Sequence, residues 1–373
     1  MACVSTPSDA QALSSDLEAA IAKRVDSLGK DAPPGFAFSI VRRGDGEIFA
    51  RRTGLEDIEQ SRPVVDETIF PFASITKTFT AIAIMLLEEE GKLSLDDPLS
   101  KTMPDFPNAA AITLRDLLVH TSGIADFTQI PAFDNDQYRD WTPDELIALI
   151  EKAPPVFAPG AKCVYNDSGY ILLGRVIEIV SGEAFMSFVD DRISTPLQMD
   201  SVAPGDVHAL VEHRAAGYVK SDTGELNEPQ YSLSAPWAAG GLVGEIGDLM
   251  KLPLVLWDGG PLISDASRKA MLAPAMLADG SACSYPLPGG SGSYGLGLEF
   301  VNIAPLGDHR AVGKSGVFPG YSGYYAVIEG TDYAIGVLAN EDGSLNLMVE
   351  MVLDIAALLI DGPAAAPEKA APQ

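Results

Sequence analysis

Strand-like alternation of apolar and polar residues occurs near both ends of this chain, and helix-like patterns fill the part between them. The strand patterns cover residues 36–43, 47–52, 294–301, 310–314, 321–328 and 333–338. A helical pattern over 13–28 precedes the first strand, and another over 344–359 follows the last. Strands from the two ends of the chain can contribute to one core by pairing with each other. We therefore expect one antiparallel sheet that is flanked by helices and has a helical part beside it.

The middle of the chain is predominantly helical, starting with a helix that opens at Ser74 and ends at Gly91. Further helical patterns cover residues 113–120, 144–152, 168–180, 185–193 and 245–252. The predicted division is an α/β (α+β) sheet part from 1–73 and 290–361, a mainly helical part from 74–289, and a disordered Ala/Pro-rich tail from 362–373. Together they would form one catalytic domain with a cleft between the two parts.

Composition excludes several kinds of partner. The chain has 52 Asp and Glu against 25 Lys and Arg, a formal net charge of −27, which argues against nucleic acid and anionic membranes. No apolar run approaches the ~20 residues of a membrane span, and the first residues lack the regions of a signal peptide. The 47% hydrophobic residues are enough to build a large core in 373 residues.

Cysteine and histidine usage indicates no metal site and leaves the cellular compartment open. Cys3, Cys163 and Cys283 are too few for a disulfide framework, and an odd number leaves at least one free. The four histidines lack metal-ligand spacing, so we expect neither a metal nor a cofactor. The small residue before Cys3 is compatible with a lipid-anchored protein of the bacterial periplasm or cell envelope, whereas an unmodified terminus would leave the chain cytoplasmic.

Ser74 and Lys77 form the strongest candidate for chemistry. A serine and a lysine three residues apart at a helix start lie on the same side, so the amine can reach the hydroxyl. A serine hydroxyl needs an adjacent base, and a partly buried lysine near another cation can lose its proton. We therefore expect Ser74 to attack a substrate and Lys77 to take its proton.

The same spacing occurs at Ser27 and Lys30, where we assign it no function. A chain of this length should contain about one or two Ser-x-x-Lys sequences by chance. Gly29 and the turn Pro33-Pro34-Gly35 follow Ser27, so no helix holds that lysine in register.

Three segments occur in the order and at the separations typical of the penicillin-recognising serine hydrolases: Ser74-x-x-Lys77, Tyr165-Asn166-Asp167 and Lys314-Ser315-Gly316. Residues 114–123 and 239–242 also resemble recurrent segments of one branch of that superfamily. This branch contains class C β-lactamases, D-alanyl-D-alanine carboxypeptidases, D-aminopeptidases and family VIII esterases. The resemblance spans residues 36–359 and implies a β-lactamase/transpeptidase-like fold.

The resemblance also implies roles for individual residues. Ser74 would be the acylated nucleophile, Lys77 its base or the partner of that base, and Tyr165 the proton shuttle to the leaving group. Lys77 and Lys314 on either side of Tyr165 would favour its phenolate. His120, within a His-Thr-Ser-Gly turn, would be a structural group that bonds backbone.

The segment Lys314-Ser315-Gly316 would form the substrate-binding edge of the site. In this interpretation the cation of Lys314 docks a substrate carboxylate. The backbone N–H of Val317, beside that of Ser74, would complete an oxyanion hole.

Asp167 departs from the pattern of the superfamily, which usually has a neutral amide at this position. An ionised carboxylate only accepts hydrogen bonds, and it would pair with Lys77 or Lys314. Carboxylate-bearing substrates would then bind weakly. We therefore expect neutral esters to be hydrolysed better than β-lactams or D-alanyl peptides.

The predicted function is that of a serine hydrolase that forms an acyl-enzyme on Ser74 and hydrolyses an amide or ester in a small-molecule or peptide substrate. One alternative is a family VIII-type carboxylesterase acting on short acyl esters. Another, from a different class, is a penicillin-binding sensor that is acylated without turnover.

Overall fold

The computed structural model describes residues 13–362, apart from 207, 230–231, 258–259, 261, 278, 288–289, 303–306 and 308. The proposed lipid anchor at Cys3 and the predicted disordered tail after residue 362 lie outside the described residues.

A nine-stranded antiparallel sheet runs through the molecule, in the order β3-β2-β1-β14-β13-β12-β11-β10-β9. Its strands are β1 (Gly35–Arg42), β2 (Gly46–Asp57), β3 (Arg62–Pro63), β9 (Ser284–Leu287), β10 (Gly290–Tyr294), β11 (Glu299–Asn302), β12 (Arg310–Phe318), β13 (Tyr321–Ile328) and β14 (Tyr333–Ala339). The first strand pairs with the last, so that Phe36 lies opposite Ala339. The predicted fold class, with one sheet built from both ends of the chain, is therefore confirmed.

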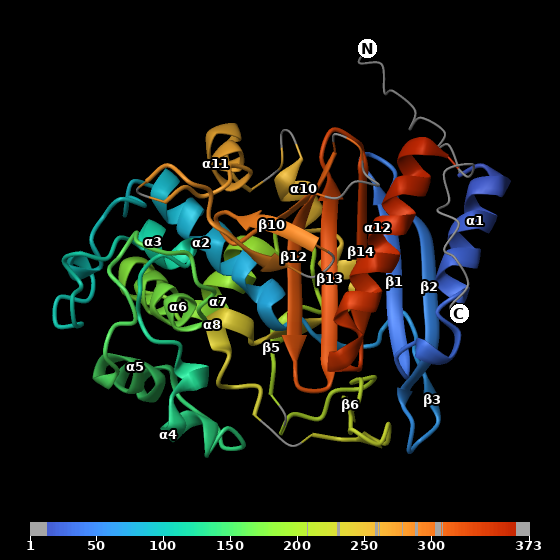
Figure 1. Ribbon diagram of the computed structural model, residues 1–373, viewed down its shortest axis with the longest axis horizontal. Helices are drawn as coiled ribbons and strands as arrows, with labels where there is room; N and C mark the ends of the chain where they lie inside the picture. The colour runs from blue at the N-terminus through green and yellow to red at the C-terminus, as the bar shows by residue number, and fades with distance from the viewer. Residues whose placement is uncertain are drawn as a thin grey trace, which may run out of the picture.

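Two helices from the ends of the chain cover one face of this sheet, α1 (Ser15–Asp26) and α12 (Leu345–Asp361) (Figure 1). Ser14 caps α1 by accepting the backbone N–H of Leu17. By length and composition, Asp342–Asp361 is the one described helical segment that could cross a membrane, and 61% of its most apolar window is buried. Because it packs on the sheet, its apolar character is that of a core helix.

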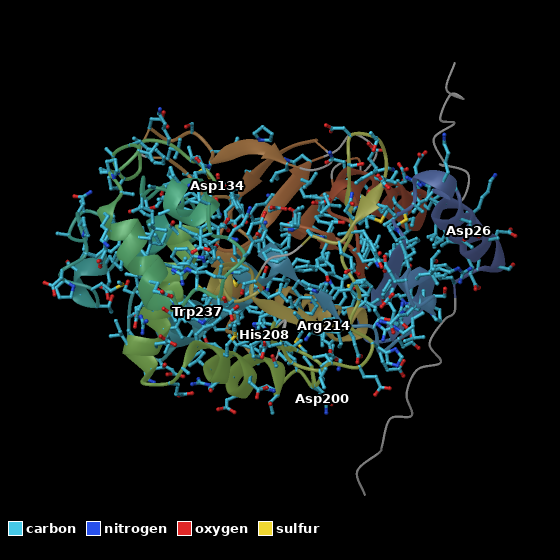
Figure 2. All side chains as sticks on the ribbon, turned by 90° about the horizontal axis from the view of Figure 1, so that it is seen from below. Asp26, Asp134, Asp200, His208, Arg214 and Trp237 are labelled. Carbon is cyan, nitrogen blue, oxygen red and sulfur yellow. A yellow bond between two sulfur atoms is a disulfide. The ribbon has the colours of Figure 1, made fainter. Side chains whose placement is uncertain are left out.

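Helices of the middle of the chain lie beside and behind the sheet, around α2 (Thr76–Glu89), whose residues 76–87 are all buried. The others are α3 (Leu114–Leu118), α4 (Pro131–Asp134), α5 (Pro143–Lys152), α6 (Ser168–Ser181), α7 (Phe185–Val189), α8 (Trp237–Gly240), α9 (Ile246–Leu249), α10 (Pro253–Leu256) and α11 (Asp265–Met271). Figure 2 shows Asp26 of α1 near one end of the long axis and Trp237 of α8 on the other side of the middle.

Short strands complete the connections: β4 (Phe70–Pro71), β5 (Ala203–Pro204) and β8 (Leu242–Gly244) form one small sheet, and β6 (Val219–Lys220) pairs with β7 (Leu226–Asn227). The pairing of β4 with β8 holds the segment before Ser74 against the segment after α8. Backbone hydrogen bonds thereby fix the position of the chain that leads to Ser74.

The strand region near the end of the sequence differs from the prediction: β9 and most of β10 lie before the first expected strand, and two expected strands have other bounds. The single strand expected over 294–301 is the end of β10 and the start of β11, because the chain turns at Gly297, which has φ 71°. A Cβ at Gly297 would lie 2.6 Å from the Cβ of Ala81, so α2 leaves room there only for glycine. The strand predicted over 310–314 is longer in the structure, since β12 continues to Phe318 and the turn to β13 contains Gly320, with a positive φ of 87°.

Candidate active site

Ser74 lies in the 3₁₀ turn Ala73–Ile75 that leads directly into α2. Ala73 before it has φ 48°, a left-handed conformation that is uncommon for alanine and is a feature of functional sites. Strand β12 passes close to this turn: a Cβ at Gly316 would lie 2.4 Å from the carbonyl oxygen of Phe72 and 3.2 Å from the nitrogen of Ser74. Glycine at 316 therefore lets the strand approach the backbone of Ser74.

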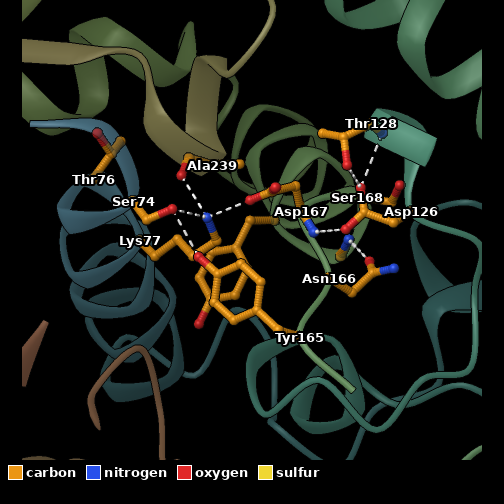
Figure 3. Close-up of polar contacts among 12 residues, drawn as sticks. Ser74, Thr76, Lys77, Asp126, Thr128, Tyr165, Asn166, Asp167, Ser168 and Ala239 are labelled. Atoms are coloured by element: carbon orange, nitrogen blue, oxygen red, sulfur yellow. Dashed lines mark hydrogen bonds and ion pairs between the residues drawn. The ribbon is translucent and has the colours of Figure 1, made fainter. Parts of the chain in front are cut away.

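Lys77 lies one helical turn after Ser74, with its amine in contact with three acceptors (Figure 3). Nζ is 2.9 Å from Ser74 Oγ, 2.7 Å from the carbonyl oxygen of Ala239 and 2.5 Å from Asp167 Oδ1. The side chain is fully buried, and burial, assisted by the charge of Lys314, lowers the pKa of Lys77 against the opposing effect of Asp167. A neutral amine can donate to Ala239 and Asp167 and direct its lone pair at the hydroxyl of Ser74.

Tyr165 contacts the same hydroxyl, with its phenolic oxygen 2.7 Å from Ser74 Oγ. The amines of Lys77 and Lys314 lie 5.0 Å and 5.1 Å from the centroid of its ring. Tyr165 thus lies beside Ser74 and Lys77, although 91 residues separate Tyr165 from Ser74 in the sequence.

The loop that carries Tyr165 is held by hydrogen bonds to the segment around His120. The backbone N–H of Val164 donates to the carbonyl of His120, and the N–H of Asn166 donates to His120 Nδ1. The side chain of Asn166 donates to the carbonyl of Ile124. The two sequence neighbours of Tyr165, Val164 and Asn166, are therefore both held in place by hydrogen bonds.

His120 has the structural role expected from its sequence context. Because its Nδ1 accepts a backbone N–H at 3.2 Å, the neutral ring carries its proton on Nε2. Burial, followed by the charges of Lys77 and Lys314, keeps the pKa of His120 well below its usual value. The ring stays uncharged and packs against the ring of Tyr165, with 4.5 Å between centroids.

Lys314 is buried in the sheet and ion-paired with Glu299, a residue that the sequence motifs did not identify. Glu299 also accepts the backbone N–H of Ser315 at 2.9 Å and its hydroxyl at 3.1 Å. Register explains the contact, since Glu299 of β11 lies opposite Gly313 of β12. In the sequence, Glu299 is the single carboxylate among the apolar residues 296–301, and this was the available sign of a special role. Its partner can be identified only from the pairing of the strands.

Asp167 lies at the start of α6, where its carboxylate faces Lys77 and its backbone faces a second acid, Asp126. Asp126 accepts the backbone N–H of Asp167 at 3.0 Å and both the N–H and the hydroxyl of Thr128. Burial, together with the charge of Asp167, raises the pKa of Asp126. No motif pointed to Asp126, because its loop has no recognisable pattern.

Cys163 and Cys283 form a disulfide, a pairing that the number of cysteines alone did not predict. Their Cα atoms are 5.3 Å apart, although 120 residues separate them in the sequence. Both sulfurs lie near the carbonyl oxygen of Val119, at 3.7 Å and 3.5 Å. The cross-link therefore begins two residues before Tyr165 and ends in the segment that precedes β9.

A cavity of about 220 Å³ opens beside Ser74 and is lined by Asp167 and Val317. The side chain of Val317 is 46% exposed, so β12 presents this residue to the cavity. Most of the remaining lining is apolar: Ala73, Phe127, Phe133, Ala235, Pro236, Ala239, Gly240, Phe318 and Pro319. The predicted substrate-binding residues Lys314, Ser315 and Gly316 lie behind this wall, within β12.

Among the residues that the structure describes, no three His, Cys, Asp or Glu side chains are grouped so that they could hold a metal ion. The side chains that the structure brings to Ser74 Oγ are those of Lys77 and Tyr165.

Comparison with known proteins agrees with this geometry. Among curated relatives, the putative penicillin-binding protein PbpX of Bacillus subtilis (strain 168) is 32% identical over 292 residues, 77% of this chain and 66% of that protein. Esterase EstB of Burkholderia gladioli is 32% identical over 197 residues, 49% of this chain and 50% of the esterase. The chain thus spans two thirds or less of the length of these relatives.

Among solved structures, D-amino acid amidase from Ochrobactrum anthropi SV3, complexed with L-phenylalanine amide, has a TM-score of 0.81 and 25% identity, covering 93% of this chain and 99% of the amidase chain. The family model described as Beta-lactamase matches residues 17–358. The chain therefore belongs to the β-lactamase family, within the penicillin-recognising serine hydrolase superfamily.

Proposed function

We propose that this chain is a serine hydrolase that forms an acyl-enzyme on Ser74 and hydrolyses an amide or ester. The observation that carries the proposal is that Ser74 Oγ lies within hydrogen-bond distance of both Lys77 Nζ and Tyr165 Oη. A nucleophile needs one group to take its proton and a group to protonate the departing atom, and this site provides both.

In the proposed reaction, Lys77 takes the proton of Ser74 as Oγ bonds to the substrate carbonyl carbon. The tetrahedral oxyanion lies against the backbone N–H groups of Ser74 and Val317. Tyr165 passes a proton to the leaving amine or alcohol as its bond to carbon breaks. Water then attacks the acyl-enzyme with Lys77 and Tyr165 in reverse roles, releasing the acid and free Ser74.

Relatives support hydrolysis of both bond types, since one is an esterase and a structural neighbour is an amidase. A carboxylesterase acting on short acyl esters is a second candidate. The observation that favours it is Asp167, whose carboxylate replaces a neutral amide beside Lys77. A sensor that is acylated without turnover is the remaining alternative.

The test is the intact mass of the protein after incubation with penicillins, D-alanyl peptides and short acyl esters. We expect an adduct that peptide mapping places on Ser74. Ser74→Ala should abolish it, and Ser27→Ala should retain it, because Ser27 is exposed at the end of α1. An adduct on Ser27 would contradict the proposal. A stoichiometric burst without steady-state turnover would indicate the sensor.

A further inference from the structure

The charges around Ser74 leave little positive charge for a substrate carboxylate. Lys314, the expected docking cation, is 1% exposed and ion-paired with Glu299, which is itself only 2% exposed. Glu299 takes two further hydrogen bonds from Ser315, so its ionised form is well satisfied. Lys314 and Glu299 together therefore contribute no net charge to the cleft.

Asp167 brings a negative charge to the wall of the cavity. Its side chain is 25% exposed and lines the cavity together with Ser74, whereas Lys77 is fully buried. Lys77 Nζ contacts Oδ1 of this carboxylate at 2.5 Å. The carboxylate is thus shared between a buried lysine on one side and the substrate cavity on the other.

The form of the site that attacks a substrate has a net negative charge. Attack by Ser74 requires Lys77 as the neutral amine, and burial favours that form. The pair of Lys77 and Asp167 then has one charge, the negative charge of Asp167. Asp126, whose carboxylate bonds to the backbone of Asp167, adds negative charge whenever it is ionised. The reactive cleft therefore attracts a cation.

The remaining lining sets the chemistry of the group that bears this cation. Phe127, Phe133 and Phe318 line the cavity of about 220 Å³, and they favour an apolar side chain. The polar lining residues Thr128, Gln137 and Ser232 are uncharged. One carboxylate in an otherwise uncharged and largely apolar cavity suits an ammonium group carried on an apolar acyl group.

We propose that the cleft selects acyl groups with an ammonium group next to the scissile carbonyl, that is, amides or esters of apolar amino acids with a free amino group. Asp167 is the residue that confers this specificity. The inference rests on the proposed attack by Ser74. The substrate ammonium pairs with Asp167 and thereby positions the carbonyl near Ser74 Oγ. Its positive charge also disfavours a proton on Lys77, so substrate binding promotes the basic form of that lysine.

The reaction with such a substrate is a simple acyl transfer. Ser74 Oγ bonds to the carbonyl carbon, its proton passes to Lys77, and the carbon–nitrogen or carbon–oxygen bond breaks as the leaving group gains a proton through Tyr165. Hydrolysis of the ester on Ser74 then releases a free amino acid. The substrate ammonium keeps its protons throughout.

The experiment compares two p-nitroanilides that differ only by the ammonium group next to the carbonyl, phenylalanine p-nitroanilide and the p-nitroanilide of 3-phenylpropionic acid. Both enantiomers of the first are assayed, because the inference concerns charge. The measured quantity is the ratio of kcat/KM for the ammonium substrate to kcat/KM for the neutral one. We expect a ratio of roughly ten or more for the wild type, and a decrease of roughly tenfold in Asp167→Asn whatever the change in absolute rate.

Asp134→Asn is the matched control, since it removes an exposed carboxylate of α4 that does not line the cavity (Figure 2). Its ratio should equal that of the wild type. A wild-type ratio near or below one would overturn the inference, and so would an unchanged ratio in Asp167→Asn.

A binding measurement keeps the inference testable if Asp167→Asn is inactive. In the Ser74→Ala background, calorimetry should show that 2-phenylethylammonium binds more tightly than 2-phenylethanol, and that adding Asp167→Asn removes the difference. Equal binding would contradict the inference. Acylation of wild-type Ser74 by a neutral activated ester tests the proposed function separately: if it occurs without any preference for ammonium, only the specificity inference fails.

Discussion

At the scale of single residues, the site depends on how two groups share the hydroxyl of Ser74. Lys77 and Tyr165 both reach Oγ, at 2.9 Å and 2.7 Å, so the proton of Ser74 has an acceptor and the leaving group a donor without rearrangement of the site. Tyr170 is also near Lys77, but burial raises the pKa of its hydroxyl, and it bonds to the carbonyl of Leu118. Tyr165 is therefore the phenol suited to proton transfer.

We expect Lys77→Ala and Tyr165→Phe each to lower kcat by roughly a hundredfold or more, because general acid–base groups contribute about 10²–10⁴. The loss in Tyr165→Phe should be smaller for a nitrophenyl ester, whose leaving group needs no proton, than for an amide. Steady-state kinetics on both substrates, with circular dichroism as a control for folding, provide the measurement. Near-normal turnover of the amide by Tyr165→Phe would show that another group transfers the proton.

His120 makes stability depend on pH. The folded state holds its pKa well below the usual 6.5, so below that value the unfolded chain binds a proton that the folded chain does not. Stability contributed by the neutral ring is therefore present above pH 6.5 and is lost as pH falls. From about pH 7.5 to about pH 5.5, wild type should lose about 1.4 kcal/mol more unfolding free energy than His120→Gln. Urea titrations at both pH values measure this difference, and equal losses would mean that His120 is protonated in the folded state.

At the scale of structural elements, the disulfide between Cys163 and Cys283 joins the loop of Tyr165 to the segment before β9. Cys283 also hydrogen-bonds through its backbone to Ala275 and Tyr294, so it belongs to a fixed part of the sheet edge. A loop without regular structure thereby acquires a rigid anchor next to Tyr165.

Replacing both cysteines by serine should lower the free energy of unfolding by about 2–4 kcal/mol. It should also lower kcat more than it changes KM, because Tyr165 loses its anchor while the cavity wall remains. Denaturant titrations and kinetics check both effects, and reductant should reproduce them in the wild type. Cys3→Ser is the control and should behave as wild type. Unchanged kcat in the double variant would show that the hydrogen bonds of His120 suffice to hold the loop.

The sequence predicted those elements whose signal is local. The spacing of Ser74 and Lys77 on a helix and the alternation of β1, β13 and β14 can be recognised within a few residues. Glu299 could not be predicted as the partner of Lys314, because their contact depends on the register of β11 against β12. Asp126 and the disulfide were missed for the same reason, since each depends on a loop brought close by the packing of α6.

At the scale of the whole molecule, 52 acidic against 25 basic residues give a formal net charge of −27, and a net charge of this size produces a long-range field that attracts cations. A cation approaching the cleft is attracted by this field, whereas a neutral substrate is not. Salt screens the attraction, since the Debye length is about 10 Å at 0.1 M.

We therefore expect kcat/KM for phenylalanine p-nitroanilide to fall several-fold between about 20 mM and about 500 mM NaCl. The value for the neutral 3-phenylpropionyl substrate should change little over the same range. Initial rates at low substrate concentration measure both. Parallel behaviour of the two substrates would show that the acidic surface has no influence on entry to the cleft.

The pairing of β1 with β14 also determines when the protein can first work. The ribosome releases Phe36 about 300 residues before its partner Ala339, an interval on the order of 15–60 s at ordinary rates of synthesis. Throughout that interval β1 has an unpaired edge, and Ser74 has already emerged on its helix. Glu299 of β11 and Lys314 of β12 are translated about 225 and about 240 residues after Ser74. Every nascent chain therefore has its nucleophile long before it has a site to use it in, and premature termination before β12 leaves a chain without a complete active site.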